Sequence, residues 1–221
     1  MATKLKKRAS ANKKSKSKNL ANSNAKERKA EVTRVTKETQ IRIAINLDGQ
    51  GKAKIDTGIP FLDHMLTAFA KHGLFDLEVS AKGDLHIDIH HTNEDVGITL
   101  GQAFCKALGE KEQIRRFGFF YVPLDDALTR VALDISGRPQ FILVKPEGEL
   151  RCTTHYDLPE AAHMLESFVQ HSGIDLHIHI ISGKDSHHVV ETVFKALARA
   201  LDMATRRDER VRGVPSTKGA L

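Results

Sequence analysis

The stretch HMLTAFAKHGLFDLEV at residues 64–79 returns in altered form as HMLESFVQHSGIDLHI at residues 163–178, 99 residues later. The two copies share His, Met, Leu, Phe, His, Gly, Asp and Leu in the same order. Further along, HHTNE at 90–94 returns as HHVVE at 187–191, 97 residues later. Self-similarity at a fixed spacing is the mark of a duplicated unit. Because there are two copies only, the sequence predicts two halves related by a pseudo-two-fold axis rather than a solenoid.

Each half mixes strand and helix patterns. Alternating β-branched residues predict strands between residues 31 and 55, and further strand patterns cover 74–89, 117–144 and 175–181. Helical patterns cover 57–73, 90–110, 159–173 and 185–204. In the first helix, Pro60 suits the first turn and Gly73 is expected just past the end. The predicted fold class is therefore α+β, a duplicated two-layer α/β unit with halves at about 31–115 and 116–221.

The amino-acid composition excludes several classes of protein. Hydrophobic residues make up 40% of the 221, aromatic residues only 5%, and there is no Trp, which argues against an aromatic platform for stacking bases. No apolar run reaches the roughly 18–20 residues that span a bilayer, so a membrane protein is excluded. Cys105 and Cys152 are too few for a disulfide framework. We expect a reducing, cytoplasmic location.

The charge is unevenly divided. Residues 1–30 hold eleven Lys or Arg and one acid, whereas residues 31–221 carry a net charge of −4. Residues 1–30 are therefore predicted to form a disordered basic tail. Three alternatives stay open for it: a solvated extension, a weak tether to nucleic acid or another polyanion, or a transit peptide that would imply an organelle. The acidic body gives no reason to expect nucleic-acid binding elsewhere.

The two halves carry the same candidate metal ligands. They are His64, His90, His91 and Glu94 in the first half, and His163, His187, His188 and Glu191 in the second. On a helix, positions i and i+4 share a face, whereas adjacent residues point about 100° apart. A single His-His pair is commonly incidental, but two copies at matching distances from HML favour a metal site. Imidazole and carboxylate without thiolate suit Mn, Fe, Co or Zn.

The sequence also predicts how these ligands are shared. Because adjacent histidines diverge, one helix start can serve two metals, or one metal and a neighbouring subunit. We expect ligands from both halves to meet at the metals. Lys195, four residues after Glu191, faces the same side of its helix. It is either a surface salt-bridge partner or part of a phosphate clamp. His72 and His171 are expected at helix ends, and His86, His177 and His179 on strands, away from the metals.

From about Val32 to Leu221, the chain resembles the imidazoleglycerol-phosphate dehydratase family. The motifs that carry the resemblance are TGIPFLDHML (57–66), KGDLHID (82–88), HHTNED (90–95), IRRFG (114–118), PLDDAL (123–128), DISGRP (134–139), GKDSHHVVE (183–191) and PSTKG (215–219). The resemblance implies a fold of the ribosomal-protein-S5-domain-2 type. It also implies a shell of twenty-four subunits, built from trimers around Mn ions, with active sites between subunits.

The resemblance implies a reaction as well: loss of water from D-erythro-imidazole-glycerol phosphate to give imidazole-acetol phosphate, in histidine biosynthesis. Two Mn²⁺ per active site would act as Lewis acids on the substrate imidazole, although other divalent metals could replace them. The eight ligands read from the duplication fall on the family's ligand positions. Glu38 falls on its acid/base position beside the reacting carbons. The positions that hold the substrate phosphate are occupied by Arg116, Arg138, Lys195, Ser216 and Lys218.

Two positions depart from the family pattern. Ile89 replaces an Asp that can orient a ligating histidine, and Ala68 replaces a common Gln. If another carboxylate orients the histidines, Asp88 and Asp95 are the nearest candidates in sequence. The alternative is that Ile89 makes a packing contact. Two rival classes of function are a different dinuclear metal enzyme, such as a phosphoesterase, and an RNA-binding protein.

Overall fold

A computed structural model describes residues 27–152 and 155–221. The order strand, strand, strand, helix, strand, helix occurs twice. The first half contains β1 (Lys29–Val35), β2 (Thr39–Asn46), β3 (Ala53–Asp56), α1 (Pro60–Gly73), β4 (Asp76–Gly83) and α2 (His90–Leu108). The second contains β5 (Phe117–Leu124), β6 (Ala127–Asp134), β7 (Gln140–Val144), α3 (Leu158–Ser172), β8 (Asp175–Ser182) and α4 (Ser186–Thr205).

Each half forms one four-stranded mixed sheet, and the two sheets match strand for strand. Their orders are β1-β2-β4-β3 and β5-β6-β8-β7. The registers match as well: Ala44 pairs with Glu31 and Glu78, and Ala132 at the equivalent place pairs with Phe119 and His177. The last strand of each order pairs in parallel with its neighbour. The predicted duplicated α+β fold is confirmed.

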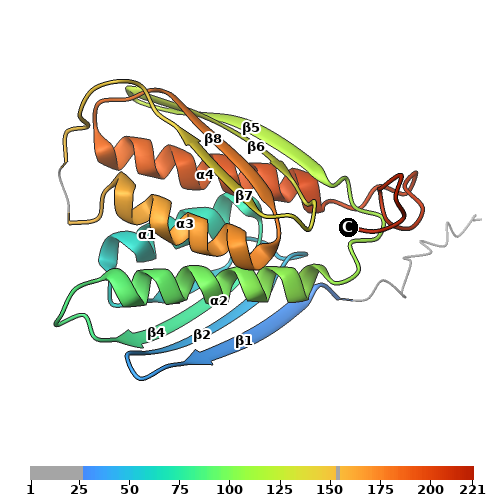
Figure 1. Ribbon diagram of the computed structural model, residues 1–221, viewed down its shortest axis with the longest axis horizontal. Helices are drawn as coiled ribbons and strands as arrows, with labels where there is room; N and C mark the ends of the chain where they lie inside the picture. Colours follow the sequence, from blue (N-terminus) through green and yellow to red (C-terminus); the bar gives the residue numbers. More distant parts are fainter. Residues whose placement is uncertain (1–26, 153–154) are drawn as a thin grey trace, which may run out of the picture.

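The four helices lie between the two sheets (Figure 1). In this helix layer α1 packs against α4, and α2 packs against α3. The contact is filled by fully buried side chains that include Phe69, Phe104, Phe168 and Phe194. Each packed pair joins one helix from each half, so side chains from opposite halves meet there. None of the helices in the described parts of the chain is long and apolar enough to cross a bilayer.

Two element boundaries differ from the sequence prediction. Gly73 is the last residue of α1 and not the residue after it; Leu74 takes the left-handed conformation, with φ 58°. Gly73 is needed because a Cβ there would lie 2.5 Å from the Phe75 ring. Residues 84–89, predicted as strand, form a turn in which Ile87 N donates to Asp84 O at 2.8 Å. His86 therefore lies in this turn, whereas His177 and His179 lie on β8 as expected.

The last residues of the predicted basic tail, 28–30, belong to the folded part of the chain. Arg28 is only 8% exposed, and its guanidinium donates to both carboxylate oxygens of Asp48 and to Thr205 O at the end of α4. With β1 starting at Lys29, residues 28–30 belong to the folded body. These residues are held because the buried guanidinium must be paired to offset its desolvation. Residues 1–26 lie outside the described residues.

Arg28→Ala is expected to lower the free energy of unfolding by about 1.5–3 kcal/mol, the typical worth of a hydrogen bond to a charged group. Thermal unfolding of the metal-free protein measures this. The Arg28 hydrogen bond lowers the pKa of Asp48, so the pair stabilises the fold above the carboxyl group's unfolded pKa of about 3.9. That contribution is lost as pH falls through the lower folded value. Deleting 1–26 should leave the Tm unchanged, and deleting 1–30 should lower it. Equal Tm values for the two deletions would contradict this role.

Candidate metal centres

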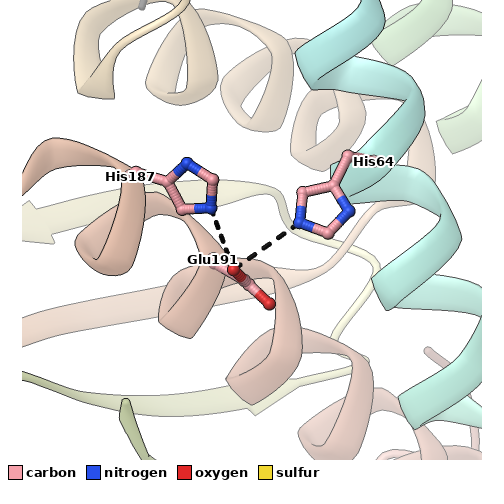
Figure 2. A group of neighbouring side chains, drawn as sticks. All are labelled: His64, His187 and Glu191. Carbon is pink, nitrogen blue, oxygen red and sulfur yellow. Dashed lines mark ion pairs between the residues drawn. The ribbon is translucent and has the colours of Figure 1, made fainter. Parts of the chain in front are cut away.

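The first candidate centre joins His64 on α1 with His187 and Glu191 on α4. Glu191 Oε2 lies 3.2 Å from His187 Nε2 and 3.6 Å from His64 Nε2. Figure 2 shows both imidazole rings directed at this carboxylate from two different helices. The three ligand atoms lie within 4.8 Å of one another, close enough for one ion to contact all of them. The Phe61 ring packs edge-on against both histidines.

The second candidate centre is the counterpart of the first with the halves exchanged. His163 on α3 meets His90 and Glu94 on α2, and their ligand atoms also lie within 4.8 Å of one another. His163 Nε2 is 3.7 Å from Glu94 Oε1, and the His163 and His90 rings stack at 4.6 Å. Both centres offer two imidazoles and one carboxylate. This donor set fits a divalent ion of the Mn, Fe, Co or Zn type and leaves further positions open.

A carboxylate two residues before the first ligating histidine bonds to the start of each helix. Asp88 Oδ1 accepts a hydrogen bond from His90 N at 2.7 Å, and Asp185 Oδ1 accepts one from His187 N at 2.9 Å. A side-chain acceptor at this place satisfies a backbone N–H that has no partner inside the helix. The first turn of each helix is therefore held, and residues i and i+4 lie on the same face of the helix.

The second histidine of each pair points away from its centre and forms a hydrogen bond with another carboxylate. His91 Nδ1 is 2.9 Å from Asp84 Oδ2, and His188 Nδ1 is 2.7 Å from Asp126 Oδ1. These hydrogen bonds raise the pKa of both histidines. In the neutral ring, donation from Nδ1 to a carboxylate leaves the lone pair on Nε2, which is the state a metal ligand requires. Because the pKa is raised, a metal ion at Nε2 has to compete with a proton.

Asp126 is itself firmly positioned. Its Oδ2 accepts hydrogen bonds from Lys184 N at 2.6 Å and from Asp185 N at 3.2 Å. The His188 hydrogen bond and these amides lower the pKa of Asp126, so it stays a carboxylate at neutral pH. Sequence reasoning missed the part played by both Asp84 and Asp126. Asp126 lies 62 residues before His188, and its strand-turn position alone does not indicate the contact.

Asp88 and Asp95, which the sequence offered as the carboxylates that orient the histidines, make other hydrogen bonds. This corrects that expectation. Asp88 accepts a hydrogen bond from His90 N, and Asp95 accepts hydrogen bonds from Arg34 and Thr39. Ile89 is half-buried and packs against the hydrophobic core. Position 89 is therefore a packing position, and the partner of His91 is Asp84. Ala68 is buried on the inner face of α1.

Glu38 and Lys195 lie beside the candidate ligands. Glu38, in the turn between β1 and β2, has Oε2 3.8 Å from His91 Nδ1. Lys195 Nζ lies 2.8 Å from Glu191 Oε1. Burial raises the pKa of Glu191, but the hydrogen bond and charge of Lys195 outweigh it, and the net shift is downward. Glu191 is therefore ionised at neutral pH, as a metal ligand must be.

The other basic positions are not brought to the metal centres of the same chain. The Arg116 guanidinium donates to Asp134 at 2.6 and 2.9 Å and to Pro215 O at 2.9 Å, next to Ser216 and the Lys218 turn. Arg116 N donates to Ala204 O, 13 residues beyond Glu191 on α4 and hence about 20 Å along the helix. Arg138 follows Gly137, which lies against the C-terminal Leu221. Arg116, Ser216 and Lys218 thus gather at the far end of α4.

Comparison with known proteins gives one consistent result. The family model described as imidazoleglycerol-phosphate dehydratase matches residues 57–201. The protein of that name from Marinobacter nauticus is 56% identical over 196 residues, which is 88% of this chain and 99% of the relative. The Thermoanaerobacter pseudethanolicus protein is 55% identical over 194 residues, covering 88% and 100%.

Solved structures agree. The imidazoleglycerol-phosphate dehydratase from Staphylococcus aureus has a TM-score of 0.71 at 34% identity, with 81% of this chain and 99% of that chain covered. The Pyrococcus furiosus structure has a TM-score of 0.72 at 37% identity, covering 86% and 100%. A duplicated α+β fold with two His/His/Glu groups in its helix layer defines a class of enzyme with two candidate metal centres. With these similarities, the chain belongs to the imidazoleglycerol-phosphate dehydratase family, and its enzyme class is hydro-lyase.

Proposed function

We propose that this chain removes water from D-erythro-imidazole-glycerol phosphate and gives imidazole-acetol phosphate, a step of histidine biosynthesis. The observation that carries the proposal is the pair of equivalent His/His/Glu groups, each joining both halves of the duplicated fold. Two equivalent donor groups suit a substrate whose imidazole ring offers two nitrogen atoms. We propose cytoplasm as the location.

Each centre would hold one divalent ion, which we propose to be Mn²⁺, so two ions serve each active site. When bound, the ions supply Lewis acidity that stabilises negative charge developing on the imidazole ring. His64, His187 and Glu191 would hold one ion, and His90, Glu94 and His163 the other. His91 and His188 diverge from these groups, with Nδ1 engaged by Asp84 and Asp126. We infer that their Nε2 atoms complete the centres of neighbouring copies.

The remaining residues act on the side chain of the substrate. Glu38, placed beside His91, would carry the proton to or from the reacting carbon or the departing hydroxyl. Arg116, Arg138, Ser216 and Lys218 would bind the phosphate, and Lys195 would add a charge next to the metal ligand Glu191. Holding the phosphate at a fixed place orients the reacting carbons with respect to Glu38.

The separation of about 20 Å along α4 between Glu191 and the residue that bonds Arg116 N supports an active site built from more than one copy of the chain. We propose active sites between subunits in a homo-oligomer, an assembly of twenty-four built from trimers. Removing the metal at neutral pH should then shrink the particle to a smaller species. Residues 1–26 carry none of the residues assigned here.

The test is to incubate the metal-loaded protein with imidazole-glycerol phosphate and follow both products. The proposal expects imidazole-acetol phosphate to form with the phosphate still attached, and activity to disappear with chelator and return with Mn²⁺. Release of inorganic phosphate in place of dehydration would instead support a metal-dependent phosphoesterase.

Asp84→Asn and Asp126→Asn are each expected to weaken metal binding by about 10–100-fold, the usual cost of losing a group that orients a ligating histidine. Asn keeps the size of Asp in both variants. At position 126 it can still accept hydrogen bonds from the backbone amides of residues 184 and 185. Metal titration into the apo-protein measures the effect, with the exposed Asp56→Asn as the matched control. Unchanged affinity in both variants would show that these carboxylates only stabilise the fold.

A further inference from the structure

We propose that Asn93 and Tyr156 are positioning residues for the second metal centre. They fix where α3 presents His163 to the rest of that centre before any ion binds. The inference deepens the proposed function, because it rests on the metal role of the His90, Glu94 and His163 group. It arises from two buried polar side chains that have no part in the reaction proposed above: Asn93 is 1% exposed and Tyr156 is 2% exposed.

The Asn93 amide ties α2 to the first turn of α3, its neighbour in the helix layer (Figure 1). Asn93 Nδ2 donates to Glu160 O at 2.8 Å. On α2, Asn93 directly precedes the ligand Glu94. On α3, Glu160 lies three residues before the ligand His163, and residues at that spacing share one side of a helix. The hydrogen bond therefore joins the two helices within about one turn of the ligands that they contribute.

The Tyr156 hydroxyl fixes the orientation of that amide. Tyr156 Oη donates to Asn93 Oδ1 at 2.8 Å. Burial raises the pKa of Tyr156, so the hydroxyl stays protonated and remains a donor at neutral pH. Rotating the Asn93 amide by half a turn would direct its oxygen at the Glu160 carbonyl, and the hydrogen bond between the helices would be lost. Tyr156 therefore acts on the metal centre through Asn93.

The ring of Tyr156 makes a separate, apolar contact. It lies 5.7 Å from the ring of Phe61, which packs edge-on against the histidines of the first centre. Replacing Tyr156 by Phe removes the hydroxyl and keeps the ring, so the contact with Phe61 is retained. The hydrogen bond to Asn93 can therefore be tested without disturbing the packing at the first centre.

The duplication supplies an internal comparison. The residue equivalent to Asn93 in the second HHxxE motif is Val190, which is fully buried on α4. The side chain of Val190 has no polar atom and cannot donate to a backbone carbonyl of α1. The hydrogen bond that joins α2 to α3 therefore has no counterpart from this position between α4 and α1. Because the two centres are held in different ways, loss of the Tyr156 hydroxyl should affect the second centre alone.

Titration of Mn²⁺ into the apo-protein tests the inference one centre at a time. His64→Ala leaves only the second centre intact, and His163→Ala leaves only the first. In the His64→Ala chain, adding Tyr156→Phe is expected to weaken Mn²⁺ binding by about 10-fold, the lower end of the usual cost of losing a group that orients a ligand. In the His163→Ala chain, the same change should leave the Mn²⁺ affinity unaltered. Tyr121→Phe, at the other tyrosine of the chain, is the matched control and should change neither affinity.

Asn93→Val, which copies the residue of the other half, should weaken the second centre at least as much as Tyr156→Phe. Combining the two changes should add nothing to Asn93→Val alone, because both act through the same hydrogen bond to Glu160 O. Fully additive losses would contradict this single route.

The Tm of each metal-free variant reports the stability of the fold separately. A pair that only stabilises the fold would lower this Tm while Mn²⁺ affinity stays the same at both centres or falls equally at both, and either result would overturn the inference. Failure of the proposed metal role has a different signature. The His64→Ala chain would then bind no Mn²⁺ even with Tyr156 in place, which would overturn the inference together with that role.

Discussion

His163→Ala is expected to lose metal at one of the two centres and to lower kcat by about 100-fold or more. Removing a group that merely orients a ligand typically costs about 10–100-fold, and His163 itself supplies one of the three donors of its centre. The same result is expected for His64→Ala, because duplication places that residue at the equivalent point of the other centre. Metal content by mass spectrometry should fall by about half in each variant, since one of two centres is damaged.

The matched control is His171→Ala. This exposed residue lies on the same helix as His163, two turns further on, and its Nδ1 contacts Ser167 O at 2.8 Å. It should keep full metal content and activity. A His163→Ala variant that binds the normal amount of metal would show that the His90, Glu94 and His163 group is a packed polar cluster and no metal centre.

Glu38→Gln is expected to lower kcat by about 10²–10⁴-fold, the usual contribution of a general acid or base. KM should change little, because the phosphate-binding residues and the metal ligands are untouched. Gln keeps the size of the side chain but cannot take up or release a proton at neutral pH. Steady-state kinetics with the metal-saturated enzyme measure the effect.

Because Glu38 lies 3.8 Å from His91 Nδ1, metal content must be measured in the same samples. Lys37→Gln, in the same exposed turn, controls for a disturbance of the hairpin. A kcat within about threefold of the unaltered enzyme, with normal metal content, would remove Glu38 from the acid/base role, since such a role is worth far more.

The sequence predicts the fold well because the two halves share one pattern. The repeated HML and HHxxE motifs predict two equivalent α+β units, and the alternation between 117 and 144 predicts the strands that form β5, β6 and β7. Boundaries are less predictable where tertiary contacts decide them. Arg28 belongs to the fold because it reaches Asp48 and Thr205, and no local pattern indicates those contacts.

For the candidate site too, the sequence predicts what local spacing decides and not what tertiary contacts decide. Spacing predicts that the two adjacent histidines of each pair diverge, and the duplication predicts that both halves contribute to each centre. The i, i+4 spacing also groups His90 with Glu94 and His187 with Glu191, and both pairs occur in the structure. The spacing does not predict that His163 joins the first pair and His64 the second, because that depends on how α2 packs on α3 and α1 on α4. Asp84 and Asp126 could not be assigned either, since both reach the histidines from turns whose conformation depends on the folded sheets.

The central claim is that metal centres and phosphate-binding residues of different chains form one active site. Mixing two inactive variants tests it most directly: His187→Ala, which damages a metal centre, and Lys218→Ala, which damages phosphate binding. The two are combined in chelator and then loaded with Mn²⁺. Up to roughly a quarter of the unaltered activity should return, because random assembly gives some sites their intact metal ligands and intact Lys218 from different chains. Mixtures that reassemble with normal size and metal content but stay inactive would contradict a site shared between copies.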